Sequence, residues 1–187
     1  PFGADPIDKL ILNKRKNKKI IILGFVGLVN MRKGIRWLIN VLNCCYEKDN
    51  LKFELHLFGR IFNEEIDTLK GAKFKIIKYG FVHKNKKNIY DLFDILIHPS
   101  FIEGSAKCIY EAMASGLPII CTEQSGSLVQ NKKNGYIIDA GDSLNLKNSL
   151  KFFIDNKKNI KIMGIKSQQI ISNYSWEKYA EKVTENY

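Results

Sequence analysis

Two carboxylates bracket a short polar stretch in the middle of the chain. Glu103 stands in a loop after a strand that Pro99 ends, and Glu111 stands on the helix that apolar spacing predicts over residues 106–115. The N–H groups near residues 104–107 lack partners within such a helix. They form a cradle for an anion, which the partial positive charge of the helix start strengthens.

The spacing between these groups suits a phosphorylated ligand. From Ser105 to Glu111 a helix rises about 9 Å, which allows a pyrophosphate at the helix start and a ribose diol further along. Glu111 could accept two hydrogen bonds from that diol, and Glu103 could face a sugar beyond the pyrophosphate. Alternatively, Lys107 and Glu111 form only an exposed ion pair one turn apart, and Glu103 is an ordinary loop acid. The spacing alone leaves both interpretations open.

Two further loops could contact the same ligand. In residues 24–34, Gly27 permits close approach of the backbone, and Lys33 stands before a helix, where anions are favoured. This loop matches neither the dinucleotide fingerprint nor the P-loop, so a plain turn with a solvated lysine is the alternative. In residues 79–83, Phe81 or Val82 could lie against a flat base.

Histidines and cysteines give no metal-binding pattern. His56, His83 and His98 are scattered along the chain, and we expect His98 to be structural. The cysteines lie in apolar helix or strand patterns without Cys-x-x-Cys spacing, where a free thiol behaves as a small hydrophobe; they are Cys44, Cys45, Cys108 and Cys121. This usage is typical of a reducing cytoplasm.

The composition is that of a basic globular protein. Its net charge is +11 with 45% hydrophobic residues, and lysine and asparagine interrupt every apolar run before it could span a membrane. Arginine occurs only at positions 15, 32, 36 and 60. Nucleic-acid sites favour arginine and interleaved aromatic residues, so the charge indicates mainly a solvated lysine-rich surface, with attraction to an anionic partner as the alternative.

Strand and helix patterns alternate along residues 20–139. Apolar runs predict strands over residues 20–26, 51–58, 74–79, 95–98, 119–121 and 136–139, and helical spacing predicts helices over 34–46, 61–69 and 106–115 with a turn over 89–93. Two or three helices follow from Ser143, the last beginning near Ser175-Trp176. This order predicts an α/β fold with a doubly wound, Rossmann-like parallel sheet, in which ligands bind at the carboxyl ends of the strands.

These residues resemble the family 4 glycosyltransferases, specifically the C-terminal, nucleotide-sugar-binding half of their GT-B fold. Residues 25–34 resemble the motif V-G-R-L-x-x-x-K-G, and residues 94–100 resemble D-V-F-V-x-P-S. Residues 103–118 resemble E-G-x-x-x-x-x-x-E-A-M-A-x-G-x-P, the most specific of these matches. Residues 1–5, 134–136 and 174–176 also resemble family segments. The resemblance implies an interdomain linker and basic lead-in over residues 1–19 and one donor-binding domain over 20–187.

The resemblance also implies roles for individual residues. Glu103 and Lys33 would be catalytic, with Lys33 neutralising the donor diphosphate and Glu103 meeting sugar hydroxyls. Glu111 would bind the ribose, and backbone N–H groups would bind phosphate or sugar at Gly104, Ser105 and Ala106. Gly27, Phe81 and Val82 complete the expected donor site. Leu28 replaces a family arginine, and Arg60 or Arg32 is expected to compensate.

The implied reaction is transfer of a sugar, with retention and without a metal or cofactor, from a UDP- or GDP-sugar to a glycan or lipid-linked acceptor. In this family the acceptor binds in an N-terminal half that these residues do not include, so we expect the isolated chain to bind donor without transferring sugar. Members often build surface polysaccharides in the cytoplasm, at the inner membrane face. The alternatives are a sugar phosphorylase or epimerase, a nucleic-acid-binding module, and a catalytically inactive relative.

Overall fold

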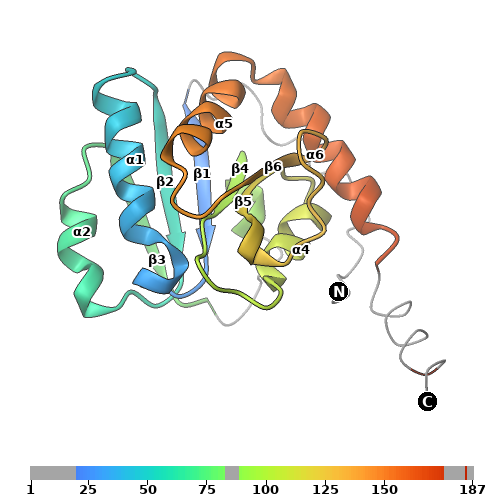
Figure 1. Cartoon of the computed structure of the whole chain (residues 1–187), viewed down its shortest axis with the longest axis horizontal. Helices are drawn as coiled ribbons and strands as arrows, with labels where there is room; N and C mark the ends of the chain where they lie inside the picture. The colour runs from blue at the N-terminus through green and yellow to red at the C-terminus, as the bar shows by residue number, and fades with distance from the viewer. Residues whose placement is uncertain (1–19, 83–88, 175–183, 185–187) are drawn as a thin grey trace.

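The computed structural model describes residues 20–82, 89–174 and Thr184. Within them, one parallel sheet has the strand order β3-β2-β1-β4-β5-β6 (Figure 1). The strands are β1 (Ile21–Val26), β2 (Phe53–Phe58), β3 (Lys75–Gly80), β4 (Ile95–His98), β5 (Ile119–Thr122) and β6 (Gly135–Ile138). The chain winds outward from β1 to β3, returns to the centre, and winds outward again from β4 to β6. The predicted doubly wound sheet is confirmed, and its winding reverses between β1 and β4.

Among the described residues, three helices lie between strands of the sheet and two follow its last strand. They are α1 (Ile35–Glu47), α2 (Ile66–Lys70), α4 (Lys107–Ala114), α5 (Ser143–Asp155) and α6 (Lys158–Ile171), with short 3-10 turns η2 (Met31–Lys33), η3 (Asn63–Glu65), η4 (Tyr90–Leu92) and η5 (Glu123–Ser125). The helix predicted over residues 61–69 is divided between η3 and α2. The predicted lead-in over 1–19, His83, and the helix expected near Ser175-Trp176 lie outside the described residues.

Two apolar layers hold the helices against the sheet. On one face, side chains such as Leu23 and Phe25 of β1 pack with α1, α2 and α5. On the other face, Ile22 of β1 and Leu96 of β4 pack with η4, α4 and the end of α6. A central parallel strand is buried on both faces, which explains why these strands read as continuous apolar runs. No helix in the described ranges is long and apolar enough to cross a membrane.

A glycine follows α4, and the four cysteines lie within helices and strands, as their apolar patterns predicted. Gly116 follows α4 with a φ of +72°, the left-handed conformation that ends many helices. All four cysteines carry free thiols. Burial raises the pKa of Cys45 and Cys121 to about 11 and that of Cys108 to about 12, so these thiols stay protonated at neutral pH.

Candidate functional site

A cleft of about 330 Å³ opens at the carboxyl ends of β1, β2, β3 and β4, where the winding of the sheet reverses. Such reversal points are where open parallel sheets bind their ligands. The cleft is lined by Val26, Gly27, Leu28, Arg32, Lys33, Phe58, Gly59, Phe81, Val82, Ile89, His98, Glu103, Ala106, Lys107, Cys108 and Glu111. Three cations and two carboxylates therefore share this space.

Glycines build one wall of the cleft from backbone alone. The Gly27 N–H donates to the Phe58 carbonyl at 2.9 Å, and the Gly59 N–H donates to the Gly80 carbonyl at 2.8 Å. Gly27 and Gly59 have φ angles of +144° and +141°, and a Cβ on Gly59 would collide with the Gly27 carbonyl oxygen. A ligand can approach this backbone closely because no side chain covers it. Gly27, which we expected at the donor site, lines this cleft, and so does Gly59.

An ion pair between Lys33 and Glu103 crosses the cleft. Asn30 positions the lysine by accepting a hydrogen bond from the Lys33 N–H at 3.1 Å, and the Phe101 N–H holds the glutamate's loop by donating to the Arg32 carbonyl at 2.9 Å. Burial lowers the pKa of Lys33, and the charge of Arg32 acts in the same direction. The two residues predicted to be catalytic thus meet although they come from different loops.

His98 ends β4 directly behind this ion pair. Its Nδ1 lies 3.5 Å from the Cys108 sulfur, and its Nε2 lies 3.7 Å from Oε2 of Glu103. Burial, and then the charge of Lys33, lowers the pKa of His98 to about 3, so the imidazole is neutral at physiological pH. His98, which we expected to be structural, is buried and lines the cleft.

The start of α4 differs from the cradle predicted at residues 104–106. Ala106 lines the cleft, but its N–H donates to the Ser125 carbonyl at 3.2 Å. The Ser105 hydroxyl lies 3.0 Å from the Tyr110 hydroxyl, and neither Ser105 nor Gly104 lines the cleft. The helix begins at Lys107 with no side-chain cap, and Lys107 and Cys108 face the cleft. Because the loop before α4 contacts η5, Lys107 and Cys108 are the first residues of the helix at the cleft.

Glu111 lies one turn further along α4 and faces the cleft. The Tyr90 hydroxyl donates to its Oε2 at 2.6 Å, and Nζ of Lys107 lies 3.9 Å from its Oε1. The glutamate side chain is 25% exposed, whereas Tyr90 is buried and burial raises its pKa. A buried phenol thus fixes one carboxylate oxygen, and the carboxylate stays open to a ligand.

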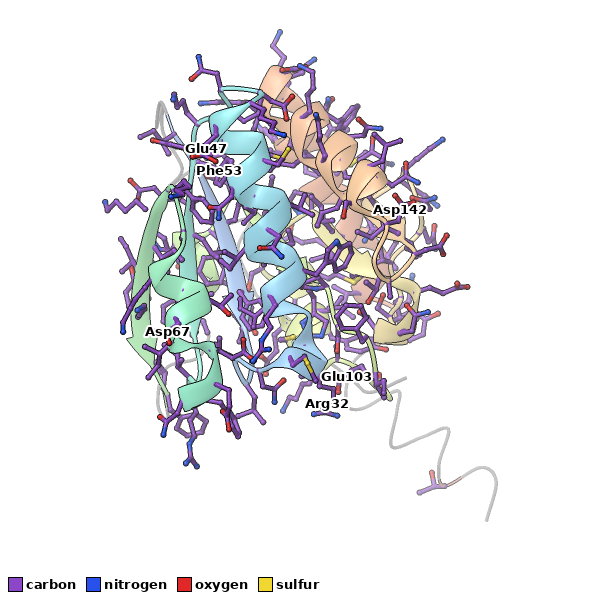
Figure 2. The ribbon with its side chains drawn as sticks, turned by 60° about the vertical axis from the view of Figure 1, so that its left-hand side comes forward. Arg32, Glu47, Phe53, Asp67, Glu103 and Asp142 are labelled. Carbon is purple, nitrogen blue, oxygen red and sulfur yellow. The ribbon has the colours of Figure 1, made fainter. Side chains whose placement is uncertain are left out.

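Of the two candidate arginines, Arg32 lines the cleft and Arg60 does not. The Arg60 guanidinium lies 5.5 Å from the centre of the Phe62 ring instead. Figure 2 shows Arg32 and Glu103 together below the start of α1. Leu28, which stands where the family motif has arginine, is 39% exposed at the same cleft.

Phe81 and Val82 also line the cleft, after β3, and Phe81 is 62% exposed. Among the residues that sequence reasoning missed or set aside, Lys107, His98, Cys108 and Gly59 lie here. His98 and Gly59 each stand at or just past the carboxyl end of a parallel strand. That position was the signal available in the sequence.

Comparison with known proteins agrees with this geometry. Residues 20–156 match the family model described as glycosyl transferases group 1. The chain is 31% identical over 179 residues to an uncharacterized glycosyltransferase of Haemophilus influenzae. The aligned region covers 91% of this chain and 49% of that protein. The chain spans about half or less of the length of the curated relatives it matches.

Two solved structures share the fold. Anabaena HepE in complex with UDP-glucose superimposes with a TM-score of 0.74 at 22% identity, covering 89% of this chain and 48% of that one. The C-terminal domain of a Francisella tularensis glycosyl transferase group 1 family protein gives a TM-score of 0.71 at 21% identity, covering 90% of this chain and 93% of that one. The family model matches most of the sequence, and the sheet is that of GT-B proteins; the chain belongs to the group 1 glycosyltransferase family.

Proposed function

We propose that this chain is the donor-binding half of a glycosyltransferase that takes a sugar from a nucleoside diphosphate sugar. The observation that supports this most directly is the meeting of Lys33, Glu103 and Glu111 in one cleft at the reversal point of the sheet. The cleft combines side-chain cations with carboxylates that can accept hydrogen bonds from hydroxyl groups. A nucleoside diphosphate sugar offers both an anionic centre and two sets of hydroxyls.

The cations would bind the diphosphate. Lys33 and Lys107 approach the cleft from the starts of α1 and α4, and Arg32 adds a guanidinium in place of the arginine that Leu28 replaces. Helix starts and cations both favour negative charge. A nucleoside diphosphate leaving group gains charge in the transition state, so the same groups would lower the barrier to its departure.

The carboxylates and the backbone would bind the rest of the donor. Glu111, held by the Tyr90 hydroxyl at 2.6 Å, would accept hydrogen bonds from the ribose diol. Glu103 would accept them from the transferred sugar. The exposed ring of Phe81, with Val82, would lie against the base. Anabaena HepE, whose fold this chain shares, has been solved in complex with UDP-glucose, which supports a UDP-sugar as the first donor to test.

The finer features of the reaction are part of the same proposal. Transfer would proceed with retention and without a metal or cofactor, because side-chain cations would neutralise the diphosphate. The acceptor would be a glycan or lipid-linked sugar, bound by a further domain of the full enzyme at the inner face of a membrane, in polysaccharide biosynthesis. The chain alone would bind donor and transfer no sugar, since its relatives are about twice as long or longer.

A thermal-shift screen tests this proposal. Ligands that bind the folded state raise the melting temperature, so UDP, GDP, UDP-glucose and GDP-mannose are compared with nucleoside monophosphates and inorganic phosphate. We expect either UDP and UDP-glucose or GDP and GDP-mannose to raise the melting temperature, and Glu111→Gln to reduce that increase. The matched control is Glu123→Gln, an exposed acid on η5 outside the cleft, which should leave the shift unchanged.

The arginines and the nucleic-acid alternative give further comparisons. Arg32→Ala is expected to weaken nucleotide binding, and Arg60→Ala, outside the cleft, to leave it unchanged. A nucleic-acid-binding module would instead bind DNA or RNA with an affinity that falls steeply as the salt concentration rises and that Glu111→Gln leaves unchanged. That pattern, with no stabilisation by any nucleoside diphosphate, would overturn the proposed function.

A further inference from the structure

His98 has an unpartnered nitrogen aimed at the candidate catalytic carboxylate. The residue is 1% exposed, and its Nε2 has no hydrogen-bond partner in the part of the chain that the structure describes. This nitrogen lies 3.7 Å from Oε2 of Glu103, just beyond hydrogen-bond distance. Buried polar groups in proteins are almost always paired, so an unpaired one beside a cleft calls for an explanation.

Cys108 determines which ring nitrogen of His98 carries the proton. The Cys108 sulfur lies 3.5 Å from Nδ1, and burial raises the pKa of this thiol to about 12, so the sulfur keeps its proton. A thiol that donates to Nδ1 leaves the hydrogen of the neutral ring on Nε2. The opposite tautomer would point a lone pair of Nε2 at the carboxylate of Glu103, which is unfavourable. The geometry therefore directs an N–H donor at Glu103.

Lys33 cannot serve both the carboxylate and a bound diphosphate. In the ligand-free chain its ammonium is paired with Glu103, and the same ammonium is the most buried cation of the cleft. A diphosphate that attracts Lys33 would leave Oε2 of Glu103 without its partner. His98 is the neighbouring donor that can then move within hydrogen-bond distance, through a shift of less than about 1 Å.

We propose that His98, held in the Nε2–H tautomer by the Cys108 thiol, takes over Glu103 from Lys33 when a nucleoside diphosphate sugar binds. His98 is thus a positioning residue: it keeps the carboxylate directed at the sugar while the lysine turns to the diphosphate. The idea rests on the proposed function, because it needs a diphosphate that competes for Lys33.

The tautomer can be measured in the ligand-free chain. Nitrogen-15 NMR of the histidine side chains distinguishes protonated from unprotonated ring nitrogens, and a His98→Phe spectrum assigns His98 among three histidines. We expect a protonated Nε2 and an unprotonated Nδ1. Cys108→Ala should move the signals toward a mixture of tautomers, whereas Cys108→Ser, which keeps a donor, should retain them. Cys45→Ala, a buried thiol on α1, is the control.

Calorimetry tests whether His98 replaces Lys33 as the partner of Glu103 when the ligand binds. UDP and UDP-glucose are titrated into wild type, His98→Phe and His98→Gln, with GDP and GDP-mannose if the screen selects guanine. We expect His98→Phe to lose about tenfold in affinity for both ligands, the order of one hydrogen bond to a charged group, because each carries the diphosphate that draws Lys33 away from Glu103. His98→Gln, whose amide can reach Glu103, should recover much of the loss.

The outcomes separate the two proposals. If the wild-type chain binds neither nucleotide nor nucleotide sugar, the proposed function is refuted, and the positioning role of His98 is refuted with it. If it binds both and His98→Phe loses affinity for neither, or His98→Gln recovers none of the loss, the positioning role is refuted and the proposed function stands. A wild-type His98 protonated on Nδ1 would also refute the role assigned to Cys108.

Discussion

Gly34→Ala should separate the loop that carries Lys33 from the end of β4. Gly34 ends η2 and begins α1 with a φ of +73°, and its N–H donates to the Met31 carbonyl at 2.9 Å. A Cβ at this position would collide with the carbonyl oxygen of Pro99. Because the obstacle is backbone, no side-chain rotation relieves the contact. The two loops that hold Lys33 and His98 must then move apart.

The cost has two parts. An alanine in the left-handed conformation loses about 1–2 kcal/mol relative to its preferred backbone. Forcing a methyl group into a packed site adds about 1–3 kcal/mol. The variant is therefore expected to lose about 2–5 kcal/mol, a large share of the roughly 5–15 kcal/mol that stabilises a typical domain.

Gly141→Ala is the matched control. Gly141 has a φ of +88° before α5, but a Cβ there would have nothing within 4 Å. It should show only the backbone strain, about 1–2 kcal/mol. Urea denaturation of both variants gives the difference, and UDP titration should show weaker binding only for Gly34→Ala. Equal losses of stability in the two variants would refute the argument from collision with Pro99.

Three more outcomes follow from the cleft. Lys33→Ala should lose about 1–3 kcal/mol of stability in urea denaturation, because the carboxylate of Glu103, whose side chain is 18% exposed, loses its charged partner, and Lys33→Met combined with Glu103→Gln should recover most of that loss. Tyr90→Phe should lose about 1–2 kcal/mol and weaken nucleotide binding less than Glu111→Gln does, since the carboxylate remains; an equal effect would contradict this. Lowering the pH from 7 to 5 should reduce the free energy of unfolding of the wild type by about 2 kcal/mol through His98. The pKa of about 3 keeps the imidazole neutral in the folded chain, whereas in the unfolded chain it protonates near the ordinary value of about 6.5. His98→Gln should therefore lose about 2 kcal/mol less than wild type over the same pH range.

Most of the fold could be predicted from local patterns. The strand expected over residues 95–98 has those bounds in the structure. The helix expected over 61–69 was wrong in detail, because η3 precedes a five-residue α2 there. Apolar periodicity indicates which residues are buried. In an α/β fold the central strands are buried on both faces and the helices on one, so the two kinds of element have different apolar patterns. The exact division of a short helix depends on contacts that periodicity does not record.

The candidate site was predictable only in part. Lys33, Glu103 and Glu111 stand beside recognisable strand ends or helix starts, and all three line the cleft. Gly104 and Ser105 also stand at a helix start but lie outside the lining, since their loop packs toward residues 125–126. A loop position in the sequence indicates which edge of the sheet a residue occupies, but not which way its side chain or N–H turns.

The sequence by itself determined the order of the elements, the doubly wound parallel sheet that they form, and the edge of the sheet where the candidate site lies. These features follow from side-chain period and from the handedness of strand–helix–strand connections, which are local properties. Only the tertiary structure decided the partners: Lys33 with Glu103, the Tyr90 hydroxyl with Glu111, and His98 between Cys108 and Glu103. Hydrogen bonds and ion pairs depend on distances of a few tenths of an ångström between loops far apart in the chain, and these distances are set when the whole sheet assembles.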